Sequence, residues 1–382
     1  MKIVIAPDSF KESLSAQEVA DQIEAGFREV FPEADYLKLP MADGGEGTVQ
    51  AMVAATRGRI VSIPVTGPLG EQVDAFYGIT GDGKTAVIEM AAASGLALVP
   101  ADLRNPILTT SYGTGELIRH ALDAGLQNII VGIGGSATND GGAGMLQALG
   151  VNLLGRDRLE LGPGGQALEQ LEEIVTSSLD PRLRKCRVQV ACDVNNPLIG
   201  AHGASAVFGP QKGATPAMVA KLDENLAHFA RLVLRDLGKD IATVPGTGAA
   251  GGMGAALLAF LDAELRPGIE IVIEAVGLEA SLSGASLVIT GEGRIDGQTI
   301  HGKTPVGVAR AARMLGIPVI GIAGSLGAEA SAVHDHGINA VFSVLRKPCS
   351  LAEALDDAAG NVCMTSRNVA ATIRLSRALT QT

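Results

Sequence analysis

Residues 131–145, VGIGGSATNDGGAGM, place six glycines around a run of small polar side chains. The glycines let backbone amides approach a ligand closely, and the hydroxyl, amide and carboxylate groups suit a nucleotide triphosphate with Mg²⁺ better than NAD. We therefore expect a phosphate-binding loop, although a glycine-rich turn that packs a buried helix is also compatible with the pattern. The candidate phosphate ligands are Gly134, Gly135, Ser136, Thr138 and Asn139, and the candidate metal ligand is Asp140.

Five further loops combine acids, lysines and glycines. An aspartate in such a loop is more often a turn former than a catalyst, but five loops together fit phosphoryl transfer. That reaction needs cations and amides for phosphate oxygens, carboxylates for Mg²⁺, and one carboxylate to accept a hydroxyl proton. The loops are APDSFKES (6–13) with Asp8, Ser9 and Lys11; MADGGEGT (41–48) with Asp43 and Glu46; ACDVNNPLIG (191–200) with Asp193, Asn195 and Asn196; FGPQKGA (208–214) with Lys212; and TGEGRIDGQTIHGKT (290–304) with Glu292, Arg294, Asp296 and Lys303.

Three glycine motifs match known nucleotide-binding sequence patterns, but the segments around them do not establish nucleotide binding. GITGDGKT (78–85) and GQTIHGKT (297–304) fit the P-loop pattern, but the first leads into a strand and favours a hairpin turn. In the second, the first glycine lies seven residues after the strand that ends at Thr290. Residues 132–137 fit a dinucleotide fingerprint, yet a lone glycine pattern often reflects only tight strand-to-helix packing. None of the three is adopted as a nucleotide motif on its own.

Composition limits the class of protein. The chain has 382 residues, 47% of them apolar and 19% charged, 49 glycines and no tryptophan, which predicts a globular α/β protein with more than one domain. A net charge of −11 argues against nucleic acid as a partner. The longest uncharged apolar stretch, 249–261, is too short to span a bilayer, and the four cysteines form no C-x-x-C pair. We expect a cytoplasmic enzyme that does not interact with membranes and is a monomer or a homodimer.

Short β-branched runs alternate with helical patterns at both ends of the chain, which is typical of a parallel sheet with crossover helices. The expected strands there are 2–8, 34–40, 59–65, 286–293, 317–324 and 340–346, and the expected helices are 16–31, 48–58, 305–316 and 328–337. We predict a discontinuous Rossmann-like domain, residues 1–65 plus 285–382, and a second α/β domain, residues 66–284, inserted into it. The inserted part should contain a hairpin at 74–90, strands at 128–134 and 187–193, and a long helix at 216–238.

The loop motifs together resemble the bacterial glycerate kinase family. The motifs IAPDSFKESLSA, PMADGGEGT, GIGGSATNDGGAGM, ACDVNNPLIGAHGA, FGPQKGA and TGEGRIDGQTIHGKTP occur in the family's order and cover nearly the whole chain. The resemblance implies ATP-dependent phosphorylation of D-glycerate, usually at the 2-hydroxyl, on a Rossmann-like domain joined to an inserted α/β domain. The implied ligands are D-glycerate, ATP and Mg²⁺.

On this interpretation each candidate residue receives a role. Asp193, which directly follows the expected strand RVQVAC, is the predicted base, with Asp296 second and Asp43 third. Lys11 and Arg294 are the predicted partners of the glycerate carboxylate. The remaining assignments are Lys212 and Lys303 for ATP, together with the glycine loop, and Asp140, Asp43 and Glu292 for the metal.

Three alternatives stay open. A nicotinamide-dependent oxidoreductase of a small hydroxy acid would use the same glycine turn and would be protected by NAD rather than ATP. A non-catalytic sensor would bind glycerate without ATP turnover. The residues alone also do not decide between phosphorylation at the 2-hydroxyl and at the 3-hydroxyl.

Overall fold

The computed structural model describes residues 1–379. The chain divides into two compact units. Unit 1 comprises Met1–Asp43, Gln50–Arg57 and Ile269–Thr382, and unit 2 comprises Gly44–Val49 and Gly58–Gly268. Among the described residues, no helix combines the length and the apolar character needed to cross a membrane.

Unit 1 is built on a parallel sheet from both ends of the chain, which confirms the predicted fold class. The strand order is β15-β13-β11-β1-β2, and every neighbouring pair is parallel. The chain runs from β1 to β2 on one side and from β11 through β13 to β15 on the other. The junction of β1 and β11 is therefore a topological switch point, where ligands of open α/β sheets bind. The strands are β1 (Lys2–Ile5), β2 (Asp35–Lys38), β11 (Leu287–Thr290), β13 (Val319–Ala323) and β15 (Ala340–Ser343).

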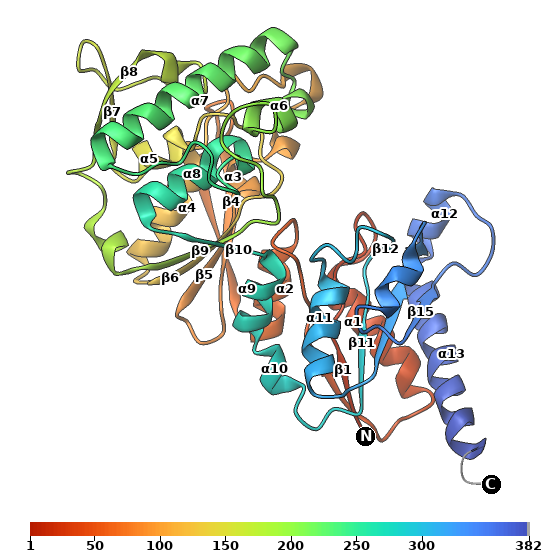
Figure 1. Cartoon of the computed structure of the whole chain (residues 1–382). Helices are drawn as coiled ribbons and strands as arrows, with labels where there is room; N and C mark the ends of the chain where they lie inside the picture. Colours follow the sequence, from red (N-terminus) through yellow and green to blue (C-terminus); the bar gives the residue numbers. More distant parts are fainter. Residues whose placement is uncertain (380–382) are drawn as a thin grey trace. The chain divides into compact units, whose positions relative to one another are not determined.

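Helices α1 (Ala16–Arg28) and α13 (Ala358–Leu379) pack side by side on one face of this sheet (Figure 1). Helix α1 begins with a capping box between Ser15 and Glu18, and its buried stripe includes Val19, Ile23 and Phe27. Helix α11 (Thr304–Met314) packs on β11 and β13. Shorter helices of this unit are α2 (Thr48–Thr56, which begins in unit 2), α9 (Gly268–Val276), α10 (Leu278–Ser281) and α12 (Leu351–Asp356).

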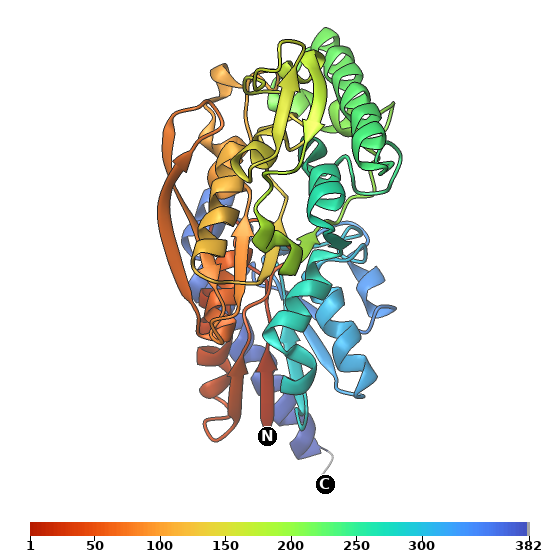
Figure 2. The same cartoon turned by 90° about the vertical axis from the view of Figure 1, so that its left-hand side faces the viewer.

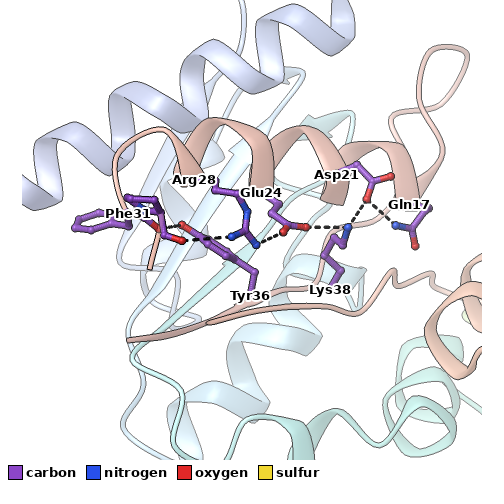
Figure 3. A network of polar contacts seen from close by, with 8 residues as sticks. Gln17, Asp21, Glu24, Arg28, Phe31, Tyr36 and Lys38 are labelled. Atoms are coloured by element: carbon purple, nitrogen blue, oxygen red, sulfur yellow. Dashed lines mark hydrogen bonds and ion pairs between the residues drawn. The ribbon is translucent and has the colours of Figure 1, made fainter. Parts of the chain in front are cut away.

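A polar network holds the edge strand β2 against α1 (Figure 3). The Lys38 ammonium donates to Asp21 at 2.7 Å and pairs with Glu24 at 2.8 Å. Arg28 pairs with Glu24 at 2.5 Å and lies 4.6 Å from the centre of the Tyr36 ring. The alternating charges attach an otherwise open sheet edge to its covering helix.

Unit 2 contains a mixed sheet with strand order β10-β9-β6-β5-β4-β3. Strands β5, β6, β9 and β10 are parallel, whereas β3 and β4 are antiparallel additions at one edge. The predicted hairpin is present: β4 pairs with β5 through a turn in which Gly83 donates to the carbonyl of Thr80. The strands are β3 (Arg59–Thr66), β4 (Gln72–Ile79), β5 (Thr85–Glu89), β6 (Asn128–Gly132), β9 (Arg187–Ala191) and β10 (Glu264–Arg266).

Two expected elements differ in the structure. Residues 59–65 were expected to extend the sheet of the chain ends, but β3 pairs along its whole length with β4 of unit 2. Its residues are mostly exposed on one face, which suits an antiparallel edge strand rather than a buried parallel one. The helix expected at 328–337 is only a 3₁₀ turn, Ala330–His334, which follows Glu329 in the left-handed region and stops at an Asp-His-Gly segment.

The helices of unit 2 pack against its sheet and against a small hairpin of β7 (Asn152–Gly155) and β8 (Leu171–Val175). The long helix α7 (Pro216–Leu237) lies along this hairpin, as both views show (Figures 1 and 2). Asp236 near the end of α7 accepts a hydrogen bond from the amide of Ile174 in β8. The other α-helices are α3 (Ala91–Ser94), α4 (Tyr112–Asp123), α5 (Ala143–Ala148), α6 (Ala204–Phe208) and α8 (Ala249–Leu261).

Candidate active site

Asp8 lies at the carboxyl end of β1, beside the switch point of the sheet in unit 1. The extended chain continues beyond β1, since the amide of Asp8 donates to the carbonyl of Gly291 and the amide of Met41 donates to that of Pro7. The loops after β2 and β11 therefore flank the loop after β1. They carry Asp43 and Glu292, both of which act electrostatically on Asp8.

The Asp8 carboxylate accepts two short hydrogen bonds. The amide of Ser9 donates at 2.6 Å, and the hydroxyl of Thr304, the first residue of α11, also donates at 2.6 Å. Burial and the neighbouring Asp43 raise the pKa of Asp8 to about 7, although the hydrogen bonds from Thr304 and Ser9 oppose the shift. A carboxyl group that titrates near neutrality can exchange a proton with a substrate hydroxyl.

Glu292 is 8% exposed and lies beside a lysine. It accepts a 2.6 Å hydrogen bond from the Thr299 hydroxyl and pairs with the Lys303 ammonium at 3.6 Å. Burial raises the pKa of Glu292 above its usual range, while Thr299 and Lys303 lower it. Lys303, predicted to bind ATP, thus stands at the start of α11 next to a carboxylate.

The carboxylates of this unit do not form a complete metal cage. Within residues 1–379 no three side chains among His, Cys, Asp and Glu lie close enough to hold a metal ion by themselves. Mg²⁺ in phosphotransferases commonly uses only one or two carboxylates and completes its shell with water and phosphate oxygens. The oxygen donors Asp43 and Glu292 fit that chemistry, and their assignment to Mg²⁺ stays a prediction.

Asp296 and Arg294 form a local pair. Their side chains meet at 3.0 Å, and Asp296 also accepts a hydrogen bond from the amide of Gln298. These contacts make Asp296 a turn former that is held by a cation, which suits proton abstraction poorly. Lys11 is exposed and makes no ion pair with the described residues, so it is available to an anionic ligand.

In unit 2, the glycine-rich loop after β6 exposes only its beginning. Gly134 and Gly135 are exposed, and Gly135 has a φ of 72°. Within the part of the chain that the structure describes, the amides of Gly134, Gly135 and Ser136 have no hydrogen-bond acceptor. Hydrogen bonds from Leu96 to Gly135 and from Ala137 to Ser94 fix the loop on both sides. Consecutive free amides around a left-handed residue form an anion-binding nest.

The rest of this loop is buried, which differs from the sequence-based expectation. Thr138, Asn139 and Asp140 are 0% exposed, and Lys212, which reaches the same loop, is 1% exposed. Their predicted contacts with a nucleotide or its metal would require the loop to open. Asn139 instead donates to the Ser205 hydroxyl at 2.9 Å.

Asp140 fixes the loop. Its carboxylate accepts hydrogen bonds from the amide and hydroxyl of Ser111 at 2.9 and 2.7 Å, and from the amides of Gly142 and Gly144 at 3.1 and 3.3 Å. Four donors leave little capacity for a metal ion and indicate a structural role, while the assignment of Asp140 to the metal stays a prediction.

Asp193, the predicted base, follows β9 in unit 2 and is exposed. Its carboxylate accepts a 2.9 Å hydrogen bond from the amide of Gly268, and this bond ties the end of β9 to the segment after β10. This hydrogen bond gives Asp193 a local structural contact, and its assignment as the base stays a prediction. From the sequence, Asp8 is one of the polar residues of the loop at 6–13 and has no predicted role. Its position directly after a buried strand was the available signal.

Together these features define an α/β protein with a carboxylate site and a turn of unpaired backbone amides, each at the carboxyl end of parallel strands. Residues 3–374 match the model of the glycerate kinase family. The chain is 62% identical to the glycerate 2-kinase of Escherichia coli K12 over 98% of both chains, and 60% identical to the glycerate kinase of Bacillus subtilis 168 over 99% of both. A crystal structure of a candidate glycerate kinase 2 from Salmonella typhimurium LT2 superposes with a TM-score of 0.92, at 63% identity and 99% coverage of both chains. The chain belongs to the glycerate kinase family.

Proposed function

We propose that this protein is a glycerate 2-kinase, which transfers the γ-phosphoryl group of ATP to the 2-hydroxyl of D-glycerate. The observation that carries the proposal is the Asp8 carboxyl group, held beside Asp43 and Glu292 at the switch point of a parallel sheet. The close full-length similarity to a glycerate 2-kinase supports the choice of substrate and hydroxyl. Hydride transfer does not require the carboxylates of Asp43 and Glu292 to act electrostatically on Asp8.

Asp8 is the proposed base. A substrate hydroxyl must lose its proton as the phosphoryl group arrives, and a carboxylate within hydrogen-bond reach is the usual acceptor. The Thr304 hydroxyl and the Ser9 amide orient the Asp8 carboxylate. In the proposed step, the glycerate oxygen forms its bond to phosphorus, the bond from phosphorus to the ADP oxygen breaks, and the proton passes to Asp8.

The glycerate carboxylate is assigned to Lys11 and Arg294. Both are exposed side chains on the loops that follow β1 and β11, the two strands of the switch point. Arg294 is partly neutralised by Asp296, so Lys11 offers the more available charge.

The nucleotide phosphates are assigned to the nest formed by the amides of Gly134, Gly135 and Ser136. Backbone amides of this arrangement donate hydrogen bonds to phosphate oxygens without a Walker motif. Asp43 and Glu292 are the proposed Mg²⁺ ligands, and Lys303 is a further candidate for the phosphates. When bound, Mg²⁺ supplies neutralisation of the phosphate charge.

The test is an assay that couples ADP release to D-glycerate, with ³¹P NMR of the product. The expected product is 2-phospho-D-glycerate, made only when ATP and Mg²⁺ are present. Formation of 3-phospho-D-glycerate would contradict the regiochemistry, and full turnover in excess EDTA would contradict the metal assignment. Reduction of NAD by glycerate in place of ADP release would favour the oxidoreductase alternative.

A further inference from the structure

Lys212 is a cation with almost no access to solvent, and the mechanism proposed above does not use it directly. Its side chain is 1% exposed, although an ammonium group is costly to bury. It comes from the 3₁₀ turn Pro210–Lys212, which ends at Gly213 in the left-handed region. A Cβ at Gly213 would lie 2.3 Å from the carbonyl oxygen of Arg104, so this turn packs closely against the backbone of Arg104.

Among the described residues, the ammonium donates hydrogen bonds to the loop after β6. The Nζ atom donates to the Ser136 hydroxyl at 2.7 Å and to the Thr138 carbonyl at 2.6 Å. Within residues 1–379 no carboxylate pairs with it directly: Asp140 acts on it only as a neighbouring charge, and the Asp140 oxygens accept hydrogen bonds from four other donors. Burying an ammonium group without a carboxylate partner destabilises a fold, so stability alone does not explain this arrangement.

Ser136 connects this buried contact to the exposed nest. Its amide is the third of the three free amides, and its side chain is held from below by Lys212. The preceding residues Gly134 and Gly135 carry no side chains and would otherwise allow the turn many conformations. Fixing Ser136 therefore restricts the direction of the nest amides.

We propose that Lys212 is a positioning residue for the nucleotide: it holds Ser136 and Thr138 so that the amides of Gly134, Gly135 and Ser136 point at a phosphate group, without touching that group itself. This inference rests on the proposed function, since it assumes that the nest binds ATP. In its protonated form, Lys212 behind the turn also makes the site more attractive to an anion.

The test measures the affinity for ATP by calorimetry and the kinetic constants for both substrates. Lys212→Met keeps the length of the side chain and removes the charge and both hydrogen bonds. We expect the Kd for ATP to rise about 10- to 100-fold, as for the loss of hydrogen bonds to a charged group. The KM for glycerate should change by less than about twofold. Lys221→Met, on the exposed side of α7, is the matched control and should leave ATP affinity unchanged.

A second variant keeps the inference testable if Lys212→Met does not fold. Ser136→Ala leaves the ammonium in place and should weaken ATP binding about 3- to 10-fold. Where both variants fold, the double variant should bind ATP no more weakly than Lys212→Met alone, because the two residues act through one contact.

Two results would overturn the positioning role. One is unchanged ATP affinity in either variant, and the other is an equal loss for ATP and glycerate together, which indicates general damage to the fold. A wild-type protein that neither binds ATP nor phosphorylates glycerate would instead contradict the proposed function.

Discussion

At the scale of single residues, Asp8 and Asp193 occupy similar places in the sequence but different environments. Each follows a parallel strand, yet Asp193 is exposed while Asp8 is surrounded by Asp43, Glu292 and the start of α11. The burial of Asp8 and its charged neighbour Asp43, rather than the residue type, support our proposal of Asp8 as the base.

Asp8→Asn should lower kcat about 10²- to 10⁴-fold while KM for ATP stays nearly constant, because the amide keeps the shape of the side chain but accepts no proton. Steady-state kinetics with purified enzyme measure both constants. Asp193→Asn is the matched control and should retain most of kcat. If Asp193→Asn loses more activity than Asp8→Asn, the original assignment of the base to Asp193 is restored.

Asp140→Asn separates a structural carboxylate from a metal ligand. It replaces an acceptor of four hydrogen bonds with an amide that can satisfy fewer of them, so the free energy of unfolding should fall by about 2–4 kcal/mol. The Mg²⁺ concentration for half-maximal activity should stay unchanged. Denaturant unfolding and a Mg²⁺ titration measure the two effects, with Asp43→Asn expected to raise the Mg²⁺ requirement. A raised requirement in Asp140→Asn would return Asp140 to the metal site.

At the scale of elements, the start of α8 supports the loop after β6. Ala250, Gly251 and Gly252 all have positive φ, and the amide of Gly141 donates to the carbonyl of Gly251. A Cβ at Gly251 would lie 2.0 Å from the carbonyl oxygen of Thr138. Thr138, whose carbonyl accepts a hydrogen bond from Lys212, is thus packed against α8 on its other side.

Gly251→Ala should destabilise the protein by about 2–4 kcal/mol, because both its backbone conformation and its contact with Thr138 exclude a methyl group. Gly238→Ala is the control. Gly238 also has a positive φ, 71°, but no atom lies within 4 Å of a Cβ added there. The control should cost about 1 kcal/mol, the conformational part alone. Equal changes in Tm for the two variants would show that the close approach of Gly251 to Thr138 does not contribute to the loss of stability.

The sequence predicts elements well where the local pattern decides them. The β-branched runs of β1 and β11 and the glycine turn between β4 and β5 are examples. It fails for β3, because the partner of a strand is set by tertiary pairing rather than by its own residues. The loop after β6 was recognised, but its burial was not. Thr138 and Asn139 resemble ligand-facing residues in sequence and are enclosed by α8 and the 3₁₀ turn of Lys212 only in the fold.

At the scale of the whole molecule, sheet order decides which loops form the site. β1 lies between β11 and β2, strands that are far apart in the sequence, and this order brings Asp8, Asp43 and Glu292 together. The sequence analysis identified all three loops without this order, so it had no means of ranking Asp8 above Asp193. The same assembly places charges where solvation is poor, and such sites lower the stability of the fold.

Asp8 and Lys212 should together make the chain's stability sensitive to pH around neutrality. Asp8 has a folded pKa of about 7, above its usual 3.8, so the folded state binds the extra proton between these values and stability falls as pH rises from 4 to 7. Lys212 has a folded pKa lowered by burial from 10.5 to about 7, so the unfolded state binds the extra proton above pH 7 and stability rises towards pH 10.

The sum of the two costs is therefore greatest near pH 7. In EDTA and without substrates, Asp8→Asn should raise the free energy of unfolding relative to wild type by about 1–3 kcal/mol at pH 7.5 and by almost nothing at pH 4. The free energy of unfolding of Lys212→Met, relative to that of the wild type, should fall from pH 7 to pH 10, because the wild type becomes more stable. The hydrogen bonds lost in the variant add a constant offset to this difference. Urea unfolding at pH 4, 6, 7.5, 9 and 10 measures both trends. A difference for Asp8→Asn that does not change between pH 4 and 7.5 would show that Asp8 ionises as freely in the folded chain as in the unfolded one, and the case for it as the base would then have to rest on geometry alone.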